Sequence, residues 1–258
     1  MKIYVLVKEV PDTYGDRKLD LETGLADRGA GDVVLDEITE RALEVALSYA
    51  DKNAGTEVVA LSMAPETSTA SVRRALAIGA ASAVHIVDDE LRGADMGLTA
   101  EVLAAAIRRG EPDLVITGNL STDGSGGMIP AMLAEHLGFA QATALSAVEI
   151  GEGRLTGTRA ADAGSQPVTV PLPAVISITE ALPDARFPNF KGIMAAKKKP
   201  LEVLSLADLG VSADPAVAPR TIMTAVAEKP PRAAGVKITD EGDAAAQLVE
   251  FLVQNRLV

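Results

Sequence analysis

Residues 118–127 combine four glycines with three hydroxyl side chains and one carboxylate. This stretch follows an apolar run at 114–116 and precedes a helical pattern that begins near Met128. Glycine permits the positive φ angles and close approach that a ligand needs, and N–H groups at a helix N-terminus favour anions. The stretch therefore predicts a loop that binds a phosphate or another anion. An ordinary flexible connection is the alternative, because Gly and Ser mark most turns.

Other kinds of chemistry find little support in the residue types present. The loop contains neither GxxxxGK[ST] nor GxGxxG, which disfavours the standard P-loop and Rossmann interpretations. Cysteine is absent, and His85 and His136 are too few for a histidine-rich metal site. We expect structural roles for both, His85 within a strand and His136 near a helix C-terminus. No nucleophile–His–acid arrangement is visible, so we expect no bond-making catalysis by this chain.

The composition predicts a globular protein with an acidic surface. Of 258 residues, 48% are hydrophobic and 23% are charged, and the formal net charge is −12. That charge argues against general nucleic-acid binding, and 3% aromatic residues leave few platforms for base stacking. No apolar run approaches the ~18 residues of a membrane span. A strand pattern begins at once, so we expect no signal peptide and a cytoplasmic location.

Strands and helices are predicted to alternate through the first half of the chain. We predict strands at 3–7, 56–61, 83–87 and 114–117, and helices at 37–47, 69–78, 98–108 and 128–137. This alternation, with fully apolar strands, indicates an α/β fold with a parallel sheet covered on both faces. Ligands bind such sheets at the carboxyl ends of the strands. Val7-Lys8, Ser62-Met63 and 118–129 would meet there if their strands are neighbours, an order that the sequence leaves open.

The second half has a different pattern. We predict β segments at 144–150, 154–160 and 168–170, and a buried strand at 172–179. A tail is expected from about Leu201, with four prolines between 215 and 231 and a terminal helix at 240–255. We therefore predict a nucleotide-binding α/β domain at 1–209, including a loop at 179–200. Residues 210–258 would form an arm that packs on a partner subunit, or alternatively on its own domain.

A basic segment follows the last buried strand. Arg186, Lys191 and the run 197–199 lie together with no acidic residue among them. Such a run can simply be a solvated surface at a helix C-terminus, where the dipole favours cations. It can also be a docking site for an acidic partner.

The residues around this basic segment carry a resemblance to a known family. Residues 178–199, Ile-Thr-Glu-Ala-Leu-Pro-Asp-Ala-Arg-Phe-Pro-Asn-Phe-Lys-Gly-Ile-Met-Ala-Ala-Lys-Lys-Lys, closely resemble the signature of the electron transfer flavoprotein β subunit. Val7-Lys8, 35–38, 73–80 and the loop after 118 support it. The resemblance covers essentially the whole chain. It implies a flavodoxin-like, adenine-nucleotide α-hydrolase-like fold with a small β region and an extended C-terminal arm.

The resemblance also implies a function. Members form heterodimers with an α subunit, accept electrons from flavin dehydrogenases such as acyl-CoA dehydrogenases, and pass them to a downstream quinone oxidoreductase. The β subunit holds a structural AMP, and the redox FAD is held mainly by the α subunit. Two alternatives remain open: a bifurcating-type subunit that binds a second FAD in place of AMP and uses NADH, and a non-redox nucleotide-binding module that signals.

Two sets of site residues follow from the resemblance. The implied nucleotide site, in which 123–129 would cradle the phosphate, comprises Leu6 (by its backbone), Asp36, Ser62, Met63, Asn119, Thr122, Asp123, Gly124, Ser125, Gly126, Gly127, Met128 and Ile129. The implied partner-binding set, in which Leu182 would be an anchor inserted into the dehydrogenase, comprises Leu182, Pro183, Arg186, Phe187 and Lys191.

The chain also departs from the family pattern at individual contacts. Members often have Gly-Lys-Gln-Ala-Ile-Asp where residues 118–123 are Gly-Asn-Leu-Ser-Thr-Asp, so a lysine at the nucleotide is missing. An Asn-Pro-Phe-Asp type entry to the first helix is replaced by Val-Val-Leu-Asp at 33–36. An acid that often follows the arginine of the middle β region is Ala160 here, after Arg159.

Overall fold

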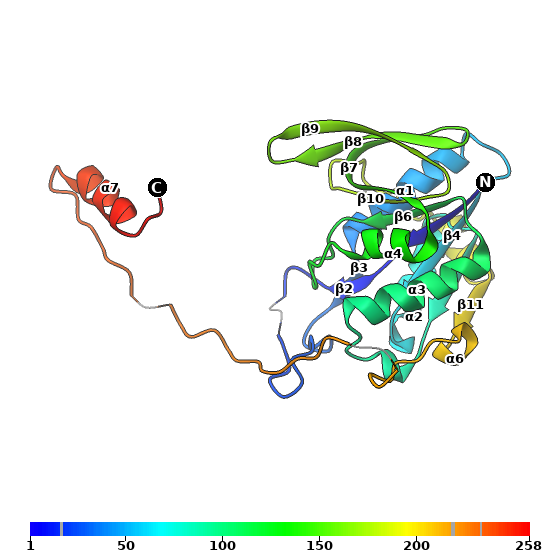
Figure 1. Cartoon of the computed structure of the whole chain (residues 1–258), viewed down its shortest axis with the longest axis horizontal. Helices are drawn as coiled ribbons and strands as arrows, with labels where there is room; N and C mark the ends of the chain where they lie inside the picture. The colour runs from blue at the N-terminus through cyan, green and yellow to red at the C-terminus, as the bar shows by residue number, and fades with distance from the viewer. Residues whose placement is uncertain (16–17, 218–219, 233) are drawn as a thin grey trace. The chain divides into compact units, whose positions relative to one another are not determined.

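A nine-stranded sheet organises the larger part of the chain (Figure 1). The computed structural model describes residues 1–15, 18–217, 220–232 and 234–258. The strands run in the order β11-β5-β4-β1-β6-β10-β7-β8-β9. Their bounds are β1 (Lys2–Leu6), β4 (Glu57–Met63), β5 (Ser82–Ile86), β6 (Leu114–Gly118), β7 (Ala140–Ile150), β8 (Arg154–Ala161), β9 (Gly164–Pro171), β10 (Ala174–Ile178) and β11 (Leu201–Leu204).

The sheet is parallel from β11 to β7 and antiparallel from β7 to β9. This confirms the predicted α/β class and the predicted β region at 144–170. A separate two-stranded ribbon pairs β2 (Glu9–Pro11) with β3 (Val33–Leu35). The helical segments are α1 (Glu37–Ala50), η1 (Glu66–Ser68), α2 (Thr69–Ile78), η2 (Asp89–Leu91), α3 (Met96–Gly110), α4 (Ile129–Leu137), α5 (Phe190–Ala196), α6 (Leu206–Leu209) and α7 (Ala244–Gln254).

Both faces of the sheet are buried, because apolar side chains alternate across its central strands. In β1, Ile3 and Val5 pack in one core with Leu43 of α1 and with side chains of α2. Tyr4 and Leu6 pack in a second core, on the opposite face, with side chains of α3 and α4. Burial on both faces of the sheet therefore explains why every residue of the run 3–7 is hydrophobic.

The capping residue predicted for the first long helix is confirmed. The Asp36 carboxylate accepts a hydrogen bond from the Ile38 N–H at 3.0 Å and so begins α1. His85 is fully buried in β5, where its Nε2 lies 3.1 Å from the Ala64 carbonyl oxygen, and burial lowers its pKa. His136 lies in the last turn of α4. The structural roles expected for the two histidines agree with these positions.

The segment after Leu201 differs from the predicted tail. Residues Leu201–Leu204 form β11, which pairs in parallel with β5 at the edge of the sheet. Leu204 and Leu206 are buried against α3 and the second core. Sequence periodicity missed this strand because it is only four residues long and alternates weakly.

The chain divides into two units, Met1–Ala225 and Val226–Val258. Within the first, Arg220 Nη2 pairs with Glu101 Oε2 at 3.0 Å, so the chain beyond 209 is still attached to α3. The second contains α7, which confirms the predicted terminal helix. The predicted boundary after 209 and the packing of 210–258 on a partner stay predictions. Among the described residues, no helix is both long and apolar enough to cross a bilayer.

Candidate functional site

Three strand ends meet at one edge of the sheet. β1 lies between β4 and β6, with Leu6 opposite Leu61 and Val5 opposite Ile116. β4 and β5 lie on one side of β1, and β6 lies on the other, so the strand order reverses between β1 and β6. In sheets of this kind, ligands bind beyond the carboxyl ends of the strands at the position where the order reverses. The expected convergence of Val7-Lys8, Ser62-Met63 and the loop after Gly118 is confirmed.

Asp36 joins the start of α1 to the loop after β6. One carboxylate oxygen caps α1, and the other accepts a hydrogen bond from the Thr122 N–H at 3.1 Å. The Asp36 backbone N–H also donates to the Lys8 carbonyl at 2.9 Å. Asp36 is 1% exposed, so these bonds are made away from water and hold the strand end, the helix and the loop together.

Asp123 is the second carboxylate that fixes the loop. Its side chain is 7% exposed, and it accepts hydrogen bonds from Lys8 Nζ at 2.7 Å and from Arg28 Nη2 at 2.8 Å. Burial alone would raise the pKa of Asp123, but the hydrogen bond and charge of Lys8, with Ser121 and Arg28, hold that pKa well below its usual range. Asp123 is therefore an ionised structural carboxylate.

The loop turns its backbone towards solvent between these fixed points and α4. Gly124, Ser125 and Gly126 are exposed, and Ser125 and Gly127 have φ angles of +48° and +64°. No side chain of the described residues caps the N-terminal end of α4. Within the described part of the chain, the N–H groups of Gly126 and Gly127 donate no hydrogen bond to protein. Such an arrangement of N–H groups at a helix start is suited to an anion.

The remaining predicted nucleotide-site residues lie along the same edge. Leu6 and Ser62 are buried at the ends of β1 and β4, and Met63 and Asn119 are partly exposed beside them. Met128 and Ile129 lie at the start of α4. Sequence reasoning placed Val7-Lys8 at this edge but did not include Lys8 among the nucleotide-binding residues. It did not place Arg28 there, because Arg28 lies in a polar stretch with no signal.

The predicted partner-binding segment follows β10 and is held against α1. Arg186 donates from Nε and Nη2 to the Glu44 carboxylate, each at 2.8 Å, and from Nη2 to Asp51 at 2.9 Å. Arg41 pairs with Asp184 and donates to the Leu182 carbonyl. Burial opposes the charge on Glu44, but the bonds from Arg186 lower its pKa, and the bond to Glu44 raises the pKa of Arg186.

Leu182 and Phe187 have opposite environments within this segment. Leu182 is 8% exposed and packs in the core beside α1, so its side chain can reach a partner only by leaving that core. Phe187 and Phe190 are 89% and 78% exposed. Pro183 and Lys191 are also exposed. Phe190, which was not among the predicted site residues, is thus one of the two aromatic side chains that this segment presents.

The basic residues of the segment do not act alike. Lys199 Nζ donates to the carbonyl oxygens of Leu76 at 2.9 Å and Ala80 at 2.6 Å, and so caps the C-terminal end of α2. Lys191, Lys197 and Lys198 are exposed. The run 197–199 directly follows α5, with Lys197 as its C-cap, so its position agrees with the helix-terminus interpretation. The docking role of the exposed lysines stays a prediction.

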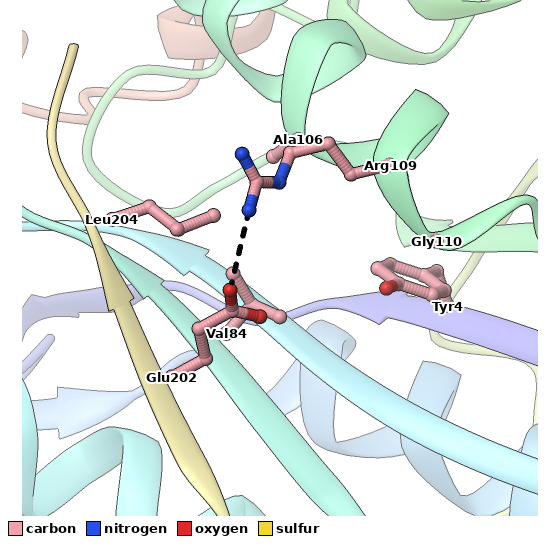
Figure 2. A pocket seen from close by; sticks show the side chains of 7 residues that line it. All are labelled: Tyr4, Val84, Ala106, Arg109, Gly110, Glu202 and Leu204. Carbon is pink, nitrogen blue, oxygen red and sulfur yellow. Dashed lines mark ion pairs between the residues drawn. The ribbon is translucent and has the colours of Figure 1, made fainter. Parts of the chain in front are cut away.

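A separate small cavity lies near the start of β1 (Figure 2). Its volume is about 170 Å³, and Arg109 at its rim pairs with Glu202 at 3.5 Å. Ligand pockets usually span roughly 300–1,000 Å³. This cavity is too small for a nucleotide, and its cation already has a partner. The loop at the carboxyl edge is therefore the better candidate site.

The fold and this loop define a doubly wound α/β protein with a candidate anion site at its switch point. Residues 23–209 match the family model described as electron transfer flavoprotein domain. The chain therefore belongs to the electron transfer flavoprotein family, as the sequence resemblance predicted.

Several curated proteins are similar over most of the chain. The electron transfer flavoprotein subunit beta of Mycobacterium tuberculosis (strain ATCC 25618 / H37Rv) is 46% identical over 263 residues, covering 99% of each chain. That of Syntrophomonas wolfei is 34% identical over 254 residues, covering 98% of this chain and 96% of the relative. Subunit CarD of the caffeyl-CoA reductase-Etf complex of Acetobacterium woodii is 32% identical over 213 residues, covering 82% of this chain and 81% of the relative.

Proposed function

We propose that this chain is the β subunit of a heterodimeric electron carrier and performs no bond-making catalysis itself. Full-length similarity to named β subunits supports an α-subunit partner. In such a carrier a flavin supplies the redox chemistry, while the protein orients the flavin and its partners and tunes their electrostatics. The proposed electron donors are flavin dehydrogenases such as acyl-CoA dehydrogenases, the acceptor is a quinone oxidoreductase, and the location is cytoplasmic.

We propose that the loop after β6 binds AMP and that FAD is held mainly by the α subunit. The observation that supports AMP most directly is the loop itself, in which two buried carboxylates fix the backbone and the N–H groups of Gly126 and Gly127 donate no hydrogen bond to the described residues. A phosphate would accept from these N–H groups. Asp36, Ser62 and Met63 would then lie beside the nucleoside.

The decisive measurement is the nucleotide released by denaturing the purified, co-expressed heterodimer. One AMP and one FAD per heterodimer would support the proposal. Two FAD and no AMP would favour a second candidate, a bifurcating-type subunit that uses NADH. Absence of both flavin and a stable partner would leave a nucleotide-binding module and overturn the proposal.

The second candidate rests on one feature of the loop and one relative. Asn119 stands where family members often have lysine, so a cation that would favour the AMP phosphate is missing from the loop itself. CarD, named as a subunit of a caffeyl-CoA reductase-Etf complex, is 32% identical. A second FAD in place of AMP would occupy the same edge of the sheet.

We propose that the segment 179–200 docks the dehydrogenase. Phe187 and Phe190 are exposed apolar side chains beside the exposed Lys191, and an apolar anchor within a charged rim is typical of interaction sites. The anchor role predicted for Leu182 would require its side chain to leave the core, so Leu182 and Arg186 are proposed to hold the segment against α1. Electron transfer from an acyl-CoA dehydrogenase should fall in Phe187→Ala and Phe190→Ala with flavin content unchanged. Val203→Ala, at an exposed apolar position on β11, is the matched control. Unchanged transfer in both Phe variants would contradict this role.

We propose that residues 210–258 pack on the α subunit. In α7, Leu248, Val249 and Phe251 are half-exposed apolar side chains within their own unit. Such a helix gains stability chiefly when its apolar face is covered. Limited proteolysis should cleave this region in the isolated chain and spare it in the heterodimer. Equal cleavage in both would count against the proposal.

A further inference from the structure

Two buried carboxylates, Asp36 from the start of α1 and Asp123 from the loop after β6, accept hydrogen bonds from backbone N–H groups of that loop. Asp36 holds the Thr122 N–H, and Asp123 accepts from the Gly124 N–H at 2.6 Å as well as from its two cations. Both side chains are almost completely buried. Left unbalanced, these two negative charges would oppose the binding of a phosphate to the same loop.

Two cations from outside the loop balance those charges. Lys8 comes from the end of β1, and its Nζ also donates to Ser121 Oγ at 3.2 Å. Arg28 comes from the polar stretch before β3, and its Nη1 donates to the Glu9 carbonyl oxygen at 3.3 Å. With Lys8 and Arg28 the cluster of four groups is neutral, and without Arg28 its net charge is −1.

Both cations are partly exposed, and Lys8 lies near the glycines of the loop. The side chains of Lys8 and Arg28 are 41% and 37% exposed, whereas the carboxylate between them is 7% exposed. A Cβ atom added to Gly124 would lie 3.8 Å from Lys8 Nζ, so the lysine is adjacent to the exposed glycines of the loop. An ammonium and a guanidinium each have more N–H groups than the bonds described here use.

We propose that Arg28 is a specificity-determining residue for the phosphate of the bound nucleotide. It compensates the second buried carboxylate, so that the loop selects a nucleoside 5′-monophosphate over the nucleoside. Lys8 supplies the cation that Asn119 does not. This inference rests on the proposed nucleotide site. It adds that Arg28, from the polar stretch 18–32, sets the charge balance of that site. The interaction is partly exposed, so the preference for the phosphate weakens as ionic strength rises.

The test compares AMP with adenosine on the nucleotide-stripped heterodimer by equilibrium dialysis. Arg28→Gln should weaken AMP binding by about tenfold and leave adenosine binding within about twofold. Arg28→Lys keeps the charge and should retain most of the preference for AMP. Arg154→Gln, at an exposed position in β8, is the matched control and should behave as wild type. Circular dichroism of each variant confirms that the complex is folded.

The outcomes separate this inference from the proposed function. If wild-type complex binds AMP more tightly than adenosine and Arg28→Gln abolishes most of that difference, the inference is supported. If Arg28→Gln keeps the full preference, or weakens both ligands equally, Arg28 does not select the phosphate and the inference fails while the nucleotide site stands. If wild-type complex binds neither ligand, both the site and the inference are overturned.

Discussion

Two loops leave neighbouring strands at the same edge of the sheet and yet present different chemistry. β6 and β10 pair in parallel, with Gly118 opposite Ile178, so the loop 119–128 and the segment 179–189 begin side by side. Each leads into a short helix, α4 or α5. The first exposes glycine backbone, and the second exposes Phe187 and Phe190. Strand order alone therefore does not decide what an edge can bind.

The same helix supports both loops by different means. The N-terminal end of α1 is bound to the first loop through Asp36. Its side holds the second segment through Arg41 and Glu44, together with Asp51 at its C-terminal end. In the first case a buried carboxylate fixes one backbone N–H of the loop, and the N–H groups of Gly126 and Gly127 donate no hydrogen bond to the described residues. In the second case, ion pairs hold Asp184 and Arg186 against α1, while the side chains of Phe187 and Phe190 are exposed to solvent.

The largest expected effect separates Leu182 from Phe187 within the second segment. Leu182→Ala should lower the free energy of unfolding by about 2–5 kcal/mol, because it leaves a cavity in the core beside α1. Phe187→Ala should change it by no more than about 0.5 kcal/mol, since the ring is exposed. Urea unfolding measures both. Similar small changes would mean that Leu182 is not part of the core in solution.

A smaller effect is expected where α1 meets the first loop. Asp36→Ala removes the cap of α1 and the acceptor of the Thr122 N–H, and should cost about 1–2 kcal/mol. Asp36→Asn keeps one acceptor oxygen and should cost less. Thermal unfolding gives the stability, and amide exchange at 120–125 gives the local effect. Exchange that stays as slow in Asp36→Ala as in wild type would contradict the link between the helix and the loop.

Weakening the clamp on the second segment should cost about 1 kcal/mol. Glu44→Gln removes the charge that Arg186 contacts, but Arg186 is 37% exposed and retains Asp51, so solvent and the second partner limit the loss. Proteolysis within 180–187 should become faster, while cleavage near 119–128 stays unchanged. Equal acceleration in both regions would indicate that the two loops are not held independently.

The smallest effect concerns acid. Asp123 and Glu44 have pKa values lowered from the ordinary 3.8 and 4.5, so each contributes stability that is complete above those ordinary values and is lost as the pH falls below them. As the pH falls below 3.8, Asp123→Asn should flatten the loss of amide protection, measured relative to the intrinsic exchange rate, in the loop 119–128 only. Glu44→Gln should flatten it in 180–187 only. A single variant that flattens both regions would show that they titrate as one unit.

Most of the fold could be predicted because its signals are local. The apolar runs at 3–7 and 114–117, the cap at Asp36 and the helix at 69–78 all appear in the structure close to where periodicity placed them. β11 was missed because four residues carry little periodicity and its burial depends on pairing with β5. The candidate anion loop was predictable from its glycines, whereas Arg28 was not, because a cation in a polar stretch gives no sign of its distant partner.

The α/β class, the family, the glycine loop and the basic segment after β10 were predictable, since each depends on residue types that lie together along the chain. The folded chain was needed to reveal that Arg28 meets Asp123, that Leu182 is buried, and that Phe190 is exposed. The first of these facts depends on two side chains that lie 95 residues apart, and the others depend on which face of a segment is covered. Burial and ion pairing between distant segments are set by packing, which a local pattern does not specify.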